Sequence, residues 1–166
     1  MELNVFYDSF KLPKTVYQMG QIRLLKFDLA SLIDQLDSLQ NQELVTKDKL
    51  KVNHLLLELL EFNNLDYTKR SDLILLQGAL ESLESQAQIL HFSFNQRPRP
   101  EFIYTLVEWL RGNIGPKILI SVGYNPSLGL GFTIRTDNKY FDCSLAKRFS
   151  SHHQELVNLI REVTET

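Results

Sequence analysis

The chain has a single cysteine, Cys143, among its 166 residues. One cysteine forms no intrachain disulfide and cannot supply a cysteine-rich zinc site, so neither can hold this fold together. Such cysteine usage suits a reducing compartment. We therefore expect a cytoplasmic protein.

A strong charge of either sign is also missing. The chain carries 18 basic and 20 acidic residues, which gives a net charge of −2. A nearly neutral chain has no long-range field that would gather nucleic acid or an anionic membrane surface. We therefore expect no nucleic-acid partner.

The sequence contains no long apolar run. Its leucine-rich stretches are interrupted every few residues by Lys, Glu, Gln or Asp, and they fall short of the roughly 20 apolar residues that a membrane-spanning helix needs. Glu2 and Asp8 precede the first lysine, unlike the layout of a secretory signal peptide. We expect no direct insertion into a membrane.

Helical spacing of apolar residues dominates the first half. Alternating steps of three and four predict a helix with a narrow apolar seam. The seam residues are Ile22, Leu25, Leu29, Leu32, Leu36 and Leu39. Thr15 and Gln18 have the spacing of a capping box, so we expect this helix to begin at Thr15, after Pro13.

Two further helices are expected before residue 89. Leu50 to Phe62 has a broad leucine face, and a second seam runs from Leu73 to Leu90 behind Ser71-Asp72. Asn63-Asn64 suits the end of the middle helix, because asparagine accepts the left-handed conformation. We predict a bundle of about three helices in residues 1–88. We favour burial of the two seams in the core of this bundle over their pairing in an intermolecular coiled coil.

Residues 89–166 have a different pattern. Ile89–Phe94 alternates like a half-buried strand, Pro100 suits the first position of a helix that reaches Arg111, and Lys117–Val122 is rich in strand-forming residues. A hairpin follows, and a stripe of apolar residues after Ser144 predicts a final helix. The expected class is α+β, with a helical bundle in residues 1–88 and a small β-α-β-β-β-α domain in residues 89–166.

The hairpin contains the most informative residues. Glycines before its first strand permit a backbone conformation that a side chain would strain, or let another backbone approach closely. Asp137-Asn138 tolerates a tight reversal, and Asp142 and Ser144 suit the free amides of the following helix. We expect Pro126, Gly129, Gly131, Arg135, Asp142 and Ser144 to determine the fold here.

This arrangement resembles the C-terminal domain of the delta subunit of F-type ATP synthases and of its mitochondrial relatives, the oligomycin-sensitivity-conferring proteins. In that family an aspartate-proline-type turn and two adjacent glycines open the hairpin, a basic or polar residue ends its first strand, and an aspartate and a serine precede the final helix. The positions that resemble these are Asn125-Pro126, Gly129 and Gly131, Arg135, and Asp142 with Ser144. The resemblance covers residues 89–166; the family's N-terminal domain is a larger bundle of six helices.

The resemblance implies a non-catalytic peripheral-stalk (stator) subunit of a rotary, proton-translocating ATP synthase. Such a subunit links the catalytic head to the stalk helices during ATP synthesis, so its partners would be the head subunits alpha and beta and the helices of the b subunits. It would lie in the cytoplasm, peripheral to the cell membrane, with no cofactor and no catalytic residue. A stator acts through extended complementary surfaces, which we expect at Ile22, Leu25, Leu29 and Leu32 of the first helix and at Phe149, Leu156, Ile160 and Val163 of the last.

Two alternatives stay open. One is the corresponding stalk subunit of a vacuolar or archaeal-type rotary ATPase, although its long N-terminal helix should show uninterrupted heptads, which Pro13 and Pro98 break here. The other is a stand-alone protein- or RNA-binding adaptor, for which Arg97 and Arg99 are the available basic pair.

Enzymatic or metal chemistry has little support in the sequence. Gly129-Leu130-Gly131 lacks the third glycine of a dinucleotide fingerprint, and Ser144 lacks a glycine-flanked nucleophile elbow. His152 and His153 are adjacent, so on a helix they point about 100° apart, which does not suit a shared metal. We expect no metal ligand, and we interpret Cys143 as a small buried apolar residue.

Overall fold

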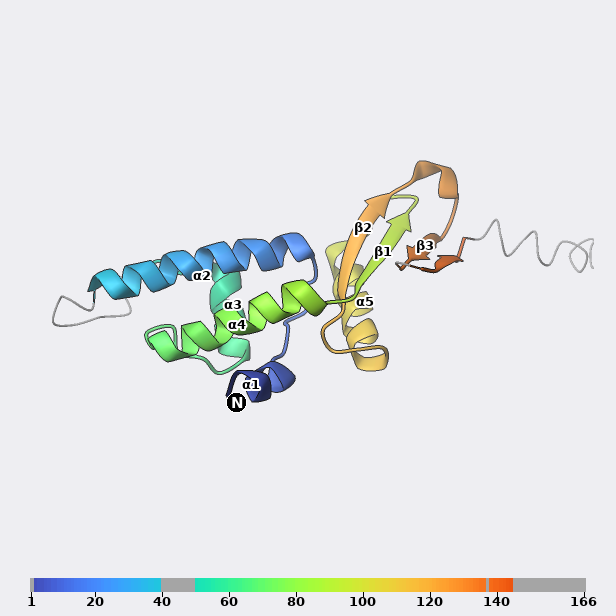
Figure 1. Cartoon of the computed structure of the whole chain (residues 1–166). Helices are drawn as coiled ribbons and strands as arrows, with labels where there is room; N and C mark the ends of the chain where they lie inside the picture. The colour runs from blue at the N-terminus through green and yellow to red at the C-terminus, as the bar shows by residue number, and fades with distance from the viewer. Residues whose placement is uncertain (1, 40–49, 137, 145–166) are drawn as a thin grey trace, which may run out of the picture. The chain divides into compact units, whose positions relative to one another are not determined.

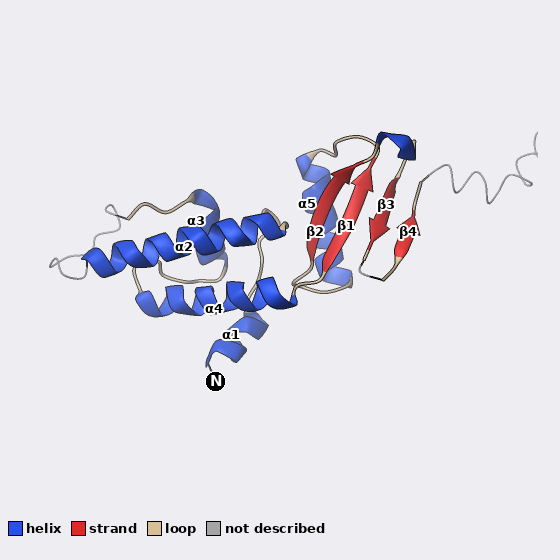
Figure 2. Ribbon diagram, turned by 45° about the horizontal axis from the view of Figure 1, so that its top comes forward, coloured by secondary structure: helices blue, strands red, loops and turns tan. Residues whose placement is uncertain are grey.

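The computed structural model describes residues 2–39, 50–136 and 138–144. Within these residues it is an α+β fold, the predicted class, with five α-helices and a four-stranded mixed sheet (Figures 1 and 2). The chain divides into two compact units, residues 1–88 with 103–120 and residues 89–102 with 121–166. We call them the helical unit and the sheet unit.

The helical unit contains α1 (Glu2–Ser9), α2 (Met19–Leu39), α3 (His54–Phe62), α4 (Arg70–Gln86) and most of α5 (Pro100–Asn113). The helix α4 packs against α1 and α2, and α3 packs against α2. The first seam is buried at Ile22, Leu25, Leu29, Leu32 and Leu36, and the second at Leu73, Leu76, Leu80 and Leu83. The second seam is shorter than predicted, because α4 ends at Gln86 and Leu90 belongs to β1. Each buried leucine or isoleucine contributes roughly 1.5–3 kcal/mol, so this bundle core is a main source of stability.

The start of α2 differs from the prediction. The helix begins at Met19 and not at Thr15. The Gln21 side chain accepts the backbone N–H groups of Tyr17 and Gln18 at 2.9 Å each, so Gln21 and not Gln18 reaches back to cap the helix. Thr15 is unavailable for this role because its hydroxyl donates to Glu58 of α3 at 2.8 Å.

The number of helices before the sheet also differs. The structure has four, because residues 2–9 form α1, which the apolar spacing did not indicate. The middle helix α3 starts at His54 and not at Leu50, and the Asn53 side chain caps it by accepting the Leu55 N–H. The expected left-handed residue after this helix is confirmed at Asn64, whose φ is 54°.

Arg111 of α5 joins the N-terminal segment to the rest of the helical unit. Its guanidinium donates to the carbonyl oxygens of Leu12 and Pro13 at 2.8 and 2.9 Å and to that of Val16 at 2.6 Å. Burial lowers the pKa of Arg111 to about 10. One side chain therefore donates to three carbonyl groups in a loop that has no regular secondary structure. These contacts help to explain why residues 103–120 group with residues 1–88.

The sheet has the strand order β2-β1-β3-β4 (Figure 2). Its strands are β1 (Ile89–Phe94), β2 (Leu119–Tyr124), β3 (Phe132–Arg135) and β4 (Tyr140–Asp142). The pairs β1–β3 and β3–β4 are antiparallel. The strands β1 and β2, which α5 connects, run parallel, because Leu119 N–H donates to Gln88 O and Asn125 N–H donates to Phe94 O, so the partner numbers rise together.

The two faces of the sheet differ in polarity. Phe92 and Phe94 are buried on one face, and both rings contact Phe132, with centroids 6.0 and 5.8 Å apart. Because strand side chains alternate, His91 and Ser93 lie on the other face. The sheet therefore has an aromatic inner face and a polar outer face.

The predicted boundary after residue 88 coincides with a limit of the helical unit. Residues 103–120, however, group with residues 1–88, whereas the sequence-based division placed them in the second domain. The expected final helix lies outside the described residues. No helix in the described part of the chain is long and apolar enough to cross a membrane.

Candidate functional site

The connection from β2 to β3, two strands that are separated by β1 in the sheet, begins with a side-chain cap. The Asn125 Oδ1 atom accepts the Ser127 N–H at 3.1 Å and the Ser127 hydroxyl at 2.7 Å. Pro126 follows at the first position of a short 3₁₀ turn, Pro126–Leu128, where its missing N–H costs nothing. Asn125 thus makes the acceptor contacts that an aspartate at this position would also make.

Two glycines precede β3, and each position requires glycine for a different structural reason. Gly131 has a φ of 115°, and a Cβ atom there would lie 2.7 Å from both Cys143 O and Ser144 Cα. Gly129 has a φ of 62° and open space around it. Gly131 is therefore required by the close approach of another backbone segment as well as by its conformation, and Gly129 by conformation alone.

The segment that approaches Gly131 is the end of β4 and the residues after it. Cys143 N–H donates to Phe132 O at 3.0 Å, and Ser144 N–H donates to Asp142 Oδ1 at 2.9 Å. Ser144 is only 4% exposed. Asp142 and Ser144 thus shape the exit from the sheet, and the proposed capping of a following helix concerns residues outside the described part.

Arg135 ends β3 on the polar outer face. It lies opposite His91 of β1 and opposite Tyr140 of β4, so the three residues form one row across three strands. The next row runs from Ser93 through Thr133, which is 5% exposed, to Asp142. The residues of the two rows other than Asp142, with Ser121 of β2, line a hollow of about 300 Å³ on this face.

The predicted partner contacts on α2 are corrected by the structure. Ile22, Leu25, Leu29 and Leu32 have no exposed surface and lie in the core of the helical unit. A fully buried side chain cannot touch a partner while the bundle is folded, so these four residues stabilise the bundle instead. The other predicted contacts, Phe149, Leu156, Ile160 and Val163, lie outside the described residues.

A different part of α2 exposes apolar surface. Leu24 and Phe27 are 63% and 73% exposed and stand one helical turn apart. The sequence offers a signal for this pair, since both residues lie off the seam of Ile22, Leu25 and Leu29. Apolar residues outside a seam are the ones that a folded bundle leaves at its surface.

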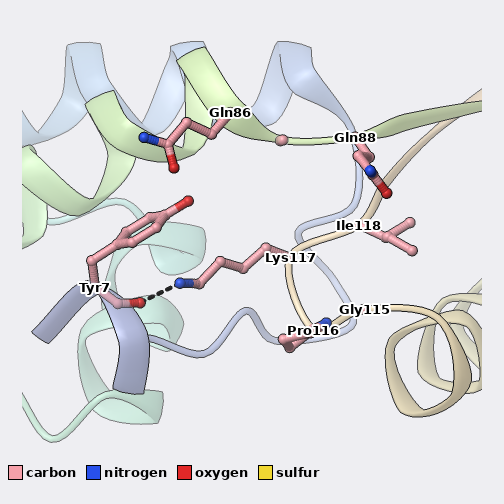
Figure 3. Close-up of a pocket in the computed structure, with 8 residues that line it drawn as sticks. Tyr7, Gln86, Gln88, Gly115, Pro116, Lys117 and Ile118 are labelled. Atoms are coloured by element: carbon pink, nitrogen blue, oxygen red, sulfur yellow. Dashed lines mark hydrogen bonds between the residues drawn. The ribbon is translucent and has the colours of Figure 1, made fainter. Parts of the chain in front are cut away.

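A second hollow, of about 230 Å³, lies within the helical unit between Tyr7, the end of α4 and residues 115–118 (Figure 3). Lys117 points into it, donates to the Tyr7 carbonyl oxygen and places its ammonium 3.3 Å from the centre of the Tyr7 ring. Burial is the main cause that lowers the pKa of Lys117 and raises that of Tyr7. The ammonium is thus already held by the chain itself, and the contact attaches α1 to the loop after α5.

Side chains that could bind a metal ion do not cluster in the part of the chain that the structure describes. No group of three His, Cys, Asp or Glu side chains there could hold a metal ion. Cys143 is exposed, whereas the sequence favoured a small buried residue. His152 and His153 lie outside the described residues.

Comparison with known proteins adds no relative. A scan against models of protein families finds no matching family, and a search of curated proteins finds no matching protein.

Proposed function

We propose that this chain is a non-catalytic subunit of the peripheral stalk of a rotary, proton-translocating ATP synthase. In this role it connects the catalytic head, made of alpha and beta subunits, to the helices of the b subunits. It works in the cytoplasm at the membrane periphery, without a cofactor, and it transmits force and not electrons or protons.

The single observation that carries the proposal is the geometry of Gly131. The resemblance to delta subunits rests on a turn, two glycines and an aspartate-serine pair, and these residues are far apart in sequence. In the structure the Gly131 backbone contacts Cys143 and Ser144, directly beside that pair. A physical contact between the separate parts of the motif supports its interpretation as one structural unit.

The exposed pair on α2 supports a binding role for the helical unit. Leu24 and Phe27 leave two large apolar side chains in water, although neither is needed to fill the bundle core. Apolar side chains of this kind are common at the centre of protein interfaces. We assign them to the contact with the catalytic head.

Co-purification tests the proposal directly. The full chain, tagged in its native cell, is purified from membranes in mild detergent at moderate salt, and the accompanying chains are identified by mass spectrometry. We expect stoichiometric recovery of alpha, beta and b subunits. Recovery of the chain alone, or with RNA, would reject the stalk assignment.

A pair of variants tests the assigned surface. Leu24→Asp with Phe27→Asp should release the head subunits, because each charge would have to be buried at the interface. Ile74→Asp is the matched control, since Ile74 is a 45% exposed apolar residue of the same unit, on α4. Equal recovery of the head subunits with both variants would contradict the assignment of the head contact to Leu24 and Phe27 of α2.

A further inference from the structure

One side of β2 is not paired with another strand. The strand stands at the end of the order β2-β1-β3-β4, so β1 is its single neighbour in the sheet. Leu119 N–H donates to Gln88 O, and Asn125 N–H donates to Phe94 O. Because the backbone groups of successive strand residues point to opposite sides, those of Ile120, Val122 and Tyr124 point away from β1.

The first of these outward groups is paired by the chain itself. Ile120 N–H donates to Tyr17 O at 2.7 Å. The outward N–H and C=O groups of Val122 and Tyr124 have no hydrogen-bond partner within residues 2–39, 50–136 and 138–144. We call these two residues the free edge of β2. Their donors and acceptors alternate at the spacing of a strand.

The free edge lacks the features that prevent strands from pairing. Edge strands are commonly protected by charged side chains, proline or a β-bulge. The strand β2 has the sequence Leu-Ile-Ser-Val-Gly-Tyr, which contains no charge and no proline. Both of its printed bonds to β1 fit one register, so no bulge interrupts it. The strand β2 can therefore accept another strand.

The side chains beside the free edge are apolar. The register places Tyr124 next to Phe94, and the Phe94 ring contacts Phe102 with centroids 5.9 Å apart. Tyr124 is 65% exposed and Phe102 is 48% exposed. A strand added to β2 would place alternate side chains beside Val122 and Tyr124, where apolar groups would cover the exposed rings.

We propose that the free edge of β2 binds an extended, uncharged segment of a partner protein as an additional strand of the sheet. Alternating backbone donors and acceptors match an extended polypeptide, whereas a nucleic acid has no such alternation. A second copy of the chain is less suitable, because an edge of two residues is much smaller than the roughly 1,200 Å² of a stable interface. The proposal does not depend on the stalk function.

The test uses the full chain, labelled with ¹⁵N, and a capped, unlabelled peptide of alternating Thr and Val. Amide shifts should saturate at about millimolar peptide, as expected for a few net hydrogen bonds, and should be largest in residues 121–124. Hydrogen exchange gives a sharper readout. The amides of Val122 and Tyr124 should exchange fast in the free chain and more slowly with peptide, whereas those of Ser121 and Gly123, which face β1, should be protected in both states.

Two pairs of variants locate the site. Val122→Pro removes an outward N–H but no bond to β1, and it should weaken binding about tenfold or more; Val122→Ala keeps the N–H and should lose much less. Tyr124→Lys leaves the backbone intact but adds a charge that opposes edge pairing, so it should also weaken binding. Tyr140→Lys is its control, since Tyr140 is 62% exposed on β4, and it should bind the peptide like the wild type.

Several results would overturn the proposal. The same peptide with every backbone amide N-methylated should not bind, so equal binding would show that backbone pairing is not involved. Slow exchange of Val122 and Tyr124 without peptide would show that the edge is already covered. A dimer of the free chain that Tyr124→Lys dissociates would assign the edge to a second copy. Shifts confined to β4, or no saturable shift, would also reject the site.

These results separate the two proposals. Failure of the peptide to bind while alpha, beta and b subunits co-purify would reject the added strand and leave the stalk assignment intact. Binding of the peptide without co-purification would do the reverse.

Discussion

At the scale of single residues, two side chains and one missing side chain decide local structure. Gly131 has no Cβ where Cys143 and Ser144 come within 2.7 Å. Arg111 satisfies three loop carbonyl groups, and Asn125 caps the turn that precedes Gly131. Each acts by geometry that a neighbour in the fold imposes.

Substitution of the glycines should give a graded loss of stability. Gly131→Ala should cost about 3 kcal/mol or more, because it combines a positive φ with a steric clash. Gly129→Ala should cost about 1–3 kcal/mol, because only the backbone conformation, with φ 62° and ψ −132°, opposes it. Denaturant unfolding of the full chain measures both.

Gly112→Ala is the control for this series. Gly112 lies in α5, and a Cβ atom added there would meet no heavy atom within 4 Å, so alanine should be neutral or stabilise the chain by up to about 1 kcal/mol. Equal stability of the Gly131 and Gly112 variants would refute the close approach at Gly131.

Removal of Arg111 should be strongly destabilising. Arg111→Leu leaves the carbonyl groups of Leu12 and Val16 without their donor and removes one of the two donors of the Pro13 carbonyl, at an expected cost of about 2–4 kcal/mol. The stability of Arg111→Lys should lie between those of wild type and Arg111→Leu, because the lysine ammonium keeps the charge but lacks the planar fork of the guanidinium. Arg70→Leu is the control, since the pair of Arg70 with Asp37 is exposed to solvent and its loss should change stability much less than the loss of Arg111.

At the scale of elements, α2 and α4 are joined by charge as well as by their leucine seams. Glu84 of α4 pairs with Lys26 at 2.6 Å and with Arg23 at 3.0 Å, both from α2. Hydrogen bonds from Lys26 first, and then from Arg23, lower the pKa of Glu84 below its ordinary value. The contact therefore favours the ionised carboxylate and depends on pH.

The sign of this dependence follows from the lowered pKa. The stabilisation is fully present above the ordinary pKa of Glu84 and is lost as pH falls through the lower pKa of the folded state. Wild type should thus exceed Glu84→Gln in unfolding free energy at pH 7, and the difference should be smaller at pH 3. Urea unfolding at both pH values measures this.

Glu81→Gln provides the comparison for Glu84. Glu81 lies on the same helix and has no ion pair within the described residues. Its substitution removes no ion pair and should lower the free energy of unfolding at pH 7 less than Glu84→Gln does. A difference between wild type and Glu84→Gln that stays constant from pH 7 to pH 3 would contradict the coupling of α2 to α4 through Glu84.

At the scale of the whole molecule, neither unit is a continuous piece of chain. Residues 103–120 belong to the helical unit although they follow the first strand of the sheet. They bring Arg111 to residues 12–16 and Lys117 to Tyr7. The stability of the N-terminal half should therefore depend on residues far beyond it.

Truncation tests this dependence. A fragment of residues 1–88 lacks Arg111 and Lys117, so it should unfold at lower temperature and with less cooperativity than the same residues in the full chain. A fragment of residues 1–120 retains every segment of the helical unit and should recover most of the loss. Thermal unfolding followed by circular dichroism compares the three. Identical unfolding of the 1–88 fragment and the full chain would refute the role of residues 103–120.

Much of the secondary structure could be predicted because it depends on local periodicity. The leucine seams of α2 and α4, the alternation in β1 and the prolines and glycines around α5 and the hairpin all follow from backbone geometry that neighbouring residues control. The need for glycine at positions 129 and 131 was also visible, since few other residues accept a positive φ.

The remaining features were decided by tertiary structure, because they join residues distant in the chain. The cap of α2 moved to Gln21 when Thr15 was taken by Glu58 of α3. The use of Arg111 and the burial of Ile22 and its neighbours also depend on which segments meet. By itself the sequence determined which elements form and where the backbone requires glycine. Only the fold decided which apolar side chains stay exposed and which cations stay unpaired, because burial and pairing are properties of contacts and not of spacing.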